Sequence, residues 1–211
     1  MAFDICKLRD SSRRLFARAR FAPGCPGNPA AWLGVLVLLT VISAPPSRAS
    51  GPETWVRVDT GASTLTVMRG EQVVASFPGI AVGRGGVSRE RRRGDHKTPL
   101  GEFRIIKVKE PSQYHRFFII DYPDEPRARL ARDAGEIDEP TFQAIRSAGR
   151  AGRLPPQNTP LGGNLGIHGL GRGDPVVHES FHWTQGCVAV TNEQIDRLAE
   201  LVRVGTRVVI D

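Results

Sequence analysis

The chemistry in this sequence centres on Cys187, which follows Gly186 and precedes a short apolar run. A thiol attacks a carbonyl carbon efficiently only as a thiolate, and a nearby imidazole can take its proton. Of the five histidines, His168 has the most suitable context, because it ends a short apolar stretch and is followed by glycine. Gly186 allows a tight turn, so that backbone N–H groups from Gln185 to Cys187 can face a developing oxyanion. These residues predict nucleophilic acyl transfer.

The use of cysteine supports this prediction. The chain has three cysteines, and two of them, Cys6 and Cys25, precede a predicted export signal. The exported part then keeps Cys187 alone, without an internal disulfide. An unpaired thiol is a liability in an oxidising compartment, whereas Ala or Val could fill a purely structural position at little cost. Retention of Cys187 favours chemistry, with an inert buried thiol and a structural His168 as the alternatives.

Residues 1–49 are typical of an export signal. The segment 30–44 is the one long apolar run, and as a helix it would span roughly 22 Å, less than the roughly 30 Å hydrocarbon core of a bilayer. A basic n-region at 1–29 precedes it, and small residues mark a cleavage site after Ala49. We therefore predict an exported domain over 50–211, located in the periplasm or cell wall, with membrane contact only through the leader.

Net charge argues against nucleic acid as the partner. The chain carries 29 basic and 22 acidic residues, and seven of the basic and two of the acidic ones lie in 1–49. The remainder, 22 basic and 20 acidic residues, has a net charge of +2. An arginine-rich run at 89–93 is interrupted by Glu90 and contains no aromatic residue. We interpret it as a solvated loop, with contact to an anionic wall polymer as the alternative.

The elements that must position these residues are mostly strands. Period-two alternation and closely spaced turn residues predict antiparallel hairpins in the first part of the exported domain. The predicted strands cover 54–59, 63–68, 72–77, 103–108, 117–120 and 207–210.

One helix is clearly predicted, over roughly 192–203. It starts at a capping box formed by Thr191 and Gln194 and continues with apolar residues at helical spacing. Region 121–162 is rich in Pro, Arg, Asp and Gly and predicts a long surface excursion, with a short helix at 141–148. The sequence thus predicts a mainly β domain, a small sandwich or barrel-like fold with one C-terminal helix and an inserted loop region.

Several motifs in this order resemble the L,D-transpeptidase catalytic domain of bacterial cell-wall enzymes. They are Ala81–Gly83, Lys97–Phe103, His168–Gly169, Thr184–Val188 and Val204–Ile210. The resemblance covers roughly residues 53–211. It implies that Cys187 is the nucleophile and His168 the general acid and base. It also implies that the chain needs no metal or organic cofactor.

The remaining site residues are likewise implied by position in these motifs. Gly186 and Gln185 would form the oxyanion site, and Thr184 would support it through hydrogen bonds. The expected substrate-binding residues are Gly169, His182 and Trp183.

Two positions depart from the family pattern. Gln185 stands where the family usually has His, and Ala189 stands where it often has Arg. Gln donates and accepts hydrogen bonds but does not titrate near neutral pH. These two departures leave the donor specificity open. His178 or His182 could compensate for the missing His and Arg side chains.

The resemblance implies an exported L,D-transpeptidase that acts on peptidoglycan stem peptides through a thioester. An L,D-carboxypeptidase or hydrolase with the same site is one alternative, and a wall-binding module with little turnover is another. A zinc site built from Cys187 and the nearby histidines is disfavoured, because their spacing matches no common ligand pair.

Overall fold

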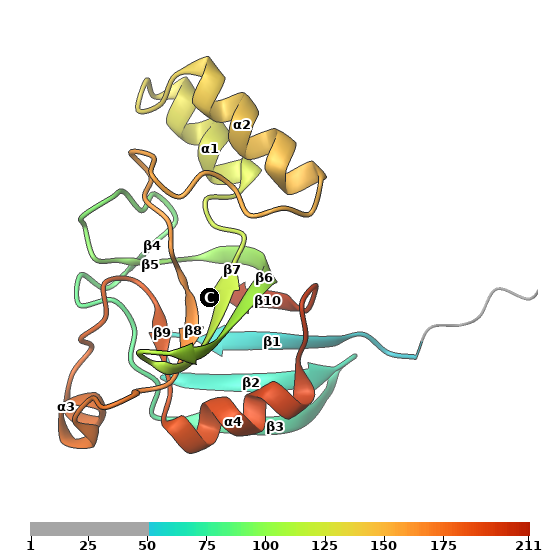
Figure 1. Ribbon diagram of the computed structural model, residues 1–211, viewed down its shortest axis with the longest axis vertical. Helices are drawn as coiled ribbons and strands as arrows, with labels where there is room; N and C mark the ends of the chain where they lie inside the picture. Colours follow the sequence, from blue (N-terminus) through green and yellow to red (C-terminus); the bar gives the residue numbers. More distant parts are fainter. Residues whose placement is uncertain (1–50) are drawn as a thin grey trace, which may run out of the picture. The chain divides into compact units, whose positions relative to one another are not determined.

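The computed structural model describes residues 51–211, and the predicted export signal over 1–49 lies outside the described residues. The strands are β1 (Thr54–Asp59), β2 (Thr64–Arg69), β3 (Gln72–Pro78), β4 (Val87–Ser88), β5 (Thr98–Pro99), β6 (Gly101–Ser112), β7 (His115–Ile120), β8 (Gly166–His168), β9 (Val188–Ala189) and β10 (Arg207–Ile210). The helices are α1 (Glu125–Asp133), α2 (Glu139–Arg150), α3 (Pro175–Ser180) and α4 (Asn192–Leu201) (Figure 1). Within 51–211, no helix is both long enough and apolar enough to cross a bilayer.

Eight strands form one sheet, in the order β3–β2–β1–β10–β6–β7–β8–β9, and β4 pairs separately with β5. Neighbours in the sheet are antiparallel except for β1–β10 and β8–β9, which are parallel. The mainly β fold class and the antiparallel β1–β2–β3 hairpins are confirmed. The alternation was informative because one face of these strands is buried: Val56, Val58, Leu65 and Val67 are fully enclosed.

The sheet curls on itself without closing into a regular barrel. Isolated bridges join Ala81 to Ala189 and Gly83 to Thr184. They connect the segment that follows β3, at one edge of the sheet, with β9 at the other edge and with the chain just before β9. The motif segment Ala81–Gly83 therefore lies beside the segment that leads to the cysteine.

Helix α4 contributes to the main core and begins as predicted. The Thr191 side chain accepts a hydrogen bond from the Gln194 N–H, and the Gln194 side chain accepts one from the Thr191 N–H. Ile195 and Leu198 are completely buried in the same core as the strand residues. Burial of a side chain of this size contributes about 1.5–3 kcal/mol.

Region 121–162 differs from the predicted surface excursion with one short helix. It holds two helices, α1 and α2, which Figure 1 shows as a pair. Each begins at an Asp N-cap, Asp124 or Asp138, followed by Glu and Pro. Proline is favourable in the first helical turn, where its missing N–H has no partner to lose. The repeated Asp-Glu-Pro triplet was the start signal, and the Pro- and Gly-rich composition obscured it.

Helix α3 was not among the elements predicted from the sequence. Pro175 is its first residue, after the N-cap Asp174, whose side chain accepts a hydrogen bond from the Val176 N–H. The proline thus starts this helix rather than preventing it.

Candidate active site

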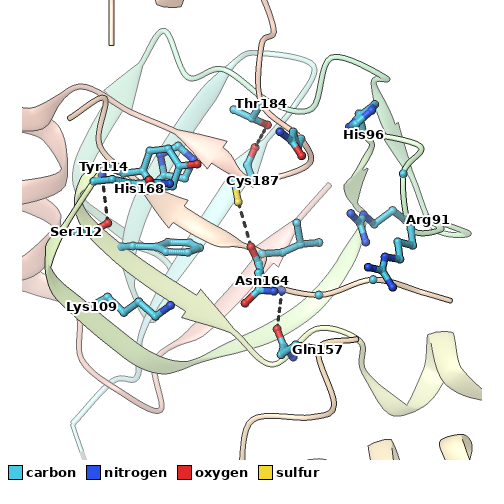
Figure 2. Close-up of a pocket in the computed structure, with 18 of the residues that line it drawn as sticks. Arg91, His96, Lys109, Ser112, Tyr114, Gln157, Asn164, His168, Thr184 and Cys187 are labelled. Atoms are coloured by element: carbon cyan, nitrogen blue, oxygen red, sulfur yellow. Dashed lines mark hydrogen bonds between the residues drawn. The ribbon is translucent and has the colours of Figure 1, made fainter. Parts of the chain in front are cut away.

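Cys187 is the residue just before β9 and lies half-buried in the wall of a cavity of about 840 Å³. Its thiol donates to the main-chain oxygen of Asn164, with 3.6 Å between Sγ and O. Figure 2 shows the sulfur pointing from the chain near Thr184 toward Asn164. The thiol is therefore open to a ligand in the cavity and is not sealed in the core.

His168 ends β8, the strand next to β9, and lines the same cavity. His168 pairs with Ala189 across the two parallel strands. Cys187 is two residues before Ala189, so its side chain leaves the sheet on the same face as that of His168. Ideal strand geometry gives a distance of roughly 8 Å between the two Cα atoms. Strand pairing thus brings together two residues that are nineteen positions apart.

Aromatic rings hold the His168 imidazole in place. Tyr114 stacks on it with 4.1 Å between ring centroids, and Phe117 and Trp183 contact it edge-on at 5.6 and 5.9 Å. Its Nδ1 lies 2.7 Å from the main-chain oxygen of Gly169. Because a carbonyl oxygen only accepts, Nδ1 carries the proton in the neutral ring, and Nε2 keeps its lone pair. The fold thus selects the tautomer that a general base needs.

Burial keeps both groups neutral in the unliganded protein. It raises the pKa of the Cys187 thiol to about 11, against smaller opposing effects of the Gly166 backbone and Arg91. Burial also lowers the pKa of His168 to about 4, and the hydrogen bond to Gly169 opposes this only in part. Near pH 7 the site therefore holds a thiol and a neutral imidazole, not a thiolate–imidazolium pair.

Gly186 occupies a backbone conformation, with φ of +120°, that residues with a side chain rarely adopt. A Cβ here would lie 2.5 Å from the main-chain oxygen of Lys97. Its N–H donates to the Thr184 hydroxyl, which in turn donates to the main-chain oxygen of Cys187. Thr184 thus fixes the turn, and the Gly186 N–H is already used.

The N–H groups on either side of Gly186 are free of such bonds. Neither the Gln185 N–H nor the Cys187 N–H donates to another group among residues 51–211. Two backbone donors, rather than the three expected from the sequence, are therefore available to an oxyanion.

The predicted substrate-binding residues are placed differently from one another. Trp183 lines the cavity, as does Gln185, which was predicted for the oxyanion site. Gly169 is not part of the lining, and a Cβ there would meet the Asn192 side chain and the backbone of Tyr114. The ring of His182 accepts a hydrogen bond from the Val82 N–H and does not line the cavity. The structure thus gives Gly169 and His182 no place in the cavity wall.

His178, the other histidine considered for compensation, is also outside the cavity lining. It is 4% exposed, and its Nδ1 accepts a hydrogen bond from the Trp183 indole at 3.4 Å. Burial lowers its pKa. His178 therefore supports Trp183, one of the rings around His168.

Sequence reasoning missed the cations of this cavity. Arg91, Arg93 and Lys109 line it. The run 89–93 was interpreted as a solvated loop, which is wrong for Arg91, because Arg91 is 5% exposed. Lys109 lies one residue beyond the predicted strand 103–108, and only the pairing of β6 with its neighbours shows that it lines the cavity.

No cluster of three or more His, Cys, Asp or Glu side chains that could hold a metal occurs within residues 51–211. The thiol and imidazole of the site are accompanied by aromatic and amide groups. The arrangement can perform nucleophilic attack, proton transfer and oxyanion stabilisation with protein groups alone.

Solved structures with similar folds include the helical cell shape determining protein Pgp2 from Campylobacter jejuni, at 19% identity, a TM-score of 0.50 and coverage of 77% of this chain and 48% of that one. Bd1075 from Bdellovibrio bacteriovorus matches at 19% identity, a TM-score of 0.49 and coverage of 76% and 48%. An L,D-transpeptidase from Enterococcus faecium matches at 13% identity, a TM-score of 0.45 and coverage of 75% and 50%. The chain spans about half the length of these proteins.

A search of curated proteins found no match. The profile of the YkuD family, described as the L,D-transpeptidase catalytic domain, matches residues 53–210. This range contains both strands of the site and nearly the whole described part of the chain. The chain therefore belongs to the YkuD family of L,D-transpeptidase catalytic domains.

Proposed function

We propose that this chain is a cysteine L,D-transpeptidase that acts on peptidoglycan stem peptides through a thioester acyl-enzyme. The observation that carries the proposal is the pairing of β8 with β9, which brings His168 and Cys187 to one cavity. Family membership supports the reaction class. The open position of the thiol and the free lone pair on the imidazole support the assigned roles.

The reaction begins when the sulfur attacks the carbonyl carbon of an L-centre residue that precedes a D-amino acid. As the S–C bond forms, the Cys187 proton moves to Nε2 of His168. The N–H groups of Gln185 and Cys187 stabilise the oxyanion. The C–N bond then breaks, His168 returns the proton to the leaving amine, and a thioester remains. An acceptor amine from a second stem then attacks the thioester and gives a proton to His168. The C–N bond of the cross-link forms, the S–C bond breaks, and His168 returns the proton to Cys187.

The neutral resting state affects the timing of proton transfer. Because the thiol has a pKa of about 11 and the imidazole a pKa of about 4, the ion pair is not formed before substrate binds. Proton transfer therefore accompanies attack on the carbonyl. This protects an exported thiol, since the thiolate is the form that oxidants attack.

Intact-mass measurement with a tetrapeptide stem tests the proposal. The wild-type protein should gain the mass of the donor without its terminal D-residue, and Cys187→Ala should gain nothing. Addition of an amine acceptor should then yield a cross-linked peptide. A hydrolysed product with every acceptor would instead indicate the L,D-carboxypeptidase alternative. Absence of any adduct on a folded protein would contradict the proposal.

We also propose that residues 1–49 direct export and are removed after Ala49. The apolar segment 30–44 and the preceding basic residues support this. N-terminal sequencing of the protein from the periplasm should begin at Ser50. A protein that keeps residues 1–49 in the cytoplasm would contradict it.

A further inference from the structure

The cavity around Cys187 carries positive charge that nothing in its lining neutralises. Its lining includes Arg91, Arg93 and Lys109, and within residues 51–211 no Asp or Glu lines it. The part of the chain after residue 49 has a net charge of only +2, so this concentration of cations is local. A cleft with charges of one sign and low-dielectric walls concentrates ligands of the opposite sign. The cavity therefore favours an anionic ligand.

Arg91 uses its charge to build the wall. Its Nε and Nη1 donate to the main-chain oxygens of Lys97 and Leu161 at 3.1 and 2.7 Å. Asp95 lies 3.8 Å from its Nε. With Nε and Nη1 committed to the protein, Arg91 is a positioning residue and not the main contact for a ligand.

Arg93 and Lys109 have no carboxylate partner among residues 51–211. Arg93 donates to the side-chain amide oxygen of Asn158 at 2.6 Å, which leaves its charge uncompensated. The Lys109 side chain forms no hydrogen bond or ion pair there, and the adjacent Glu110 pairs with Arg116. Both side chains are exposed to the cavity and to solvent. Both charges are therefore available to a ligand.

The two free cations lie on different walls. Lys109 comes from β6, whereas Arg93 follows Arg91 in the 89–97 loop. Figure 2 shows Lys109 on one side of the cavity and Arg91 on the other, with Cys187 and Asn164 between them. A peptide bound over the thiol would thus have one cation on each side of its reacting bond.

Strand register indicates which side Lys109 serves. Lys109 pairs with Phe117, and Phe117 pairs with His168, so the three residues form one row across the sheet. The Cα atoms of Lys109 and His168 are about 10 Å apart, two strand spacings. His168 must face the leaving amine in order to protonate it. The leaving D-residue and its carboxylate therefore lie toward Lys109, and the rest of the donor stem lies toward Arg93.

We propose that Arg93 and Lys109 select donor stems with a free carboxylate on each side of the scissile bond. Lys109 binds the carboxylate of the leaving D-residue, and Arg93 binds a side-chain carboxylate of the remaining donor stem. This rests on the proposed function of the site. Stems in which these carboxylates are carboxamides bind more weakly, since an amide brings no charge to either cation.

Four matched tetrapeptides test this: the free acid, the C-terminal amide, the donor side-chain amide and the double amide. Each single amidation should raise KM about tenfold and change kcat less than about twofold. Lys109→Gln should abolish discrimination against the C-terminal amide alone. Arg93→Gln should abolish discrimination against the side-chain amide alone. Lys107→Gln and Arg89→Gln remove the same charge from exposed positions outside the cavity lining and should keep both preferences.

Binding to Cys187→Ala, measured by calorimetry, separates this inference from the proposed function. Equal affinity for acid and amides would overturn the inference, even if the wild-type protein forms a thioester with all four peptides. Preference for the acid that persists in Lys109→Gln and Arg93→Gln would also overturn it. Preference lost in these variants would support it, whether or not a thioester forms.

Discussion

The curled sheet and the α1–α2 insertion are stabilised in different ways. The sheet buries aliphatic side chains from its strands and α4 in one continuous core. The insertion has a core of six residues, Ala128, Ala131, Ile137, Phe142, Ile145 and Leu161, and is surrounded by ion pairs. The buried Arg127 donates to Glu136 at 2.5 Å, and Arg92, from the 89–97 loop, donates to the other oxygen of that carboxylate at 2.5 Å.

The sheet and the insertion also differ in the charge of their titratable groups. In the sheet, burial keeps Cys187 and His168 neutral. In the insertion, the two arginines keep Glu136 ionised and lower its pKa. One small domain thus keeps the two groups of its sheet site neutral by burial and binds an added segment through a paired charge.

The insertion is connected to the site through Arg91. The Arg127 Nε and the Tyr122 hydroxyl both donate to the main-chain oxygen of Arg91, at 3.1 and 3.2 Å. Tyr122 also donates to Leu161, which accepts from the Arg91 side chain. The cation-bearing wall of the cavity therefore depends on both regions.

The largest effect is expected in catalysis, which we assign to the sheet and not to the insertion. His168→Gln removes the group that accepts the thiol proton, and kcat should fall about 10²–10⁴-fold with little change in KM. Gln143→Ala, an exposed position on α2, is the control and should keep full activity. Steady-state kinetics with a tetrapeptide donor measures both. Wild-type turnover by His168→Gln would remove His168 from the mechanism.

Alkylation of Cys187 tests whether the sheet site is neutral, in contrast to the ionised Glu136 of the insertion. In full-length protein with Cys6→Ser and Cys25→Ser, the rate of reaction of Cys187 with iodoacetamide should rise about tenfold per pH unit from pH 7 to 10, because only the thiolate reacts. It should level off near the pKa of about 11. A plateau already reached near pH 6 would indicate a preformed thiolate–imidazolium pair and contradict the neutral site.

Large-to-small substitutions compare the two cores. Ile167→Ala in β8 should destabilise the whole domain by about 2–5 kcal/mol, because Ile167 is completely buried in the main core. Phe142→Ala in α2 should cost about 3–5 kcal/mol but melt mainly the insertion. Hydrogen exchange resolved by segment distinguishes them. Equal loss of protection in the sheet and in α1–α2 for both variants would show that the two regions unfold as one unit.

Glu136 gives the insertion a pH dependence through a paired carboxylate. Its pKa is lower in the folded protein, so its contribution to stability is present above the ordinary Glu pKa of about 4.3 and is lost as pH falls below it. Glu136→Gln should cost about 1–3 kcal/mol at pH 7, since Arg127 stays buried without its carboxylate. Exchange protection of α1 at pH 7 and pH 3 measures this. Acid loss that is unchanged in Glu136→Gln would assign the effect to another group.

Loss of a helix N-cap is expected to have the smallest effect on stability. Asp138→Ala removes the N-cap of α2, and Thr191→Ala removes that of α4. Each should cost about 1 kcal/mol. Chemical denaturation should detect the Thr191→Ala change globally and the Asp138→Ala change mainly through α2 helicity. An effect of Asp138→Ala on the midpoint of sheet unfolding as large as that of Thr191→Ala would argue against separate stabilities.

Much of the sheet could be predicted because its strands alternate and one face is buried. Strand β1 and strand β10 have the predicted bounds, and the capping box at Thr191 is formed. The insertion was predicted poorly because the Pro and Gly residues of region 121–162 were interpreted as loop residues, so that α1 was missed and only 141–148 of α2 was predicted. Their start signals, Asp124 and Asp138, required that proline be considered a first-turn residue.

The sequence by itself determined the local parts of this protein: the strands, the α4 cap, and the glycine beside Cys187. These depend on neighbours along the chain. Only the tertiary structure decided that His168 faces the cavity with Nε2 free, that the Gly186 N–H is already used, and that Arg93 and Lys109 line one cavity from different segments. Each of these depends on contacts between segments far apart in the sequence, and residue spacing carries no information about which faces and side chains will meet.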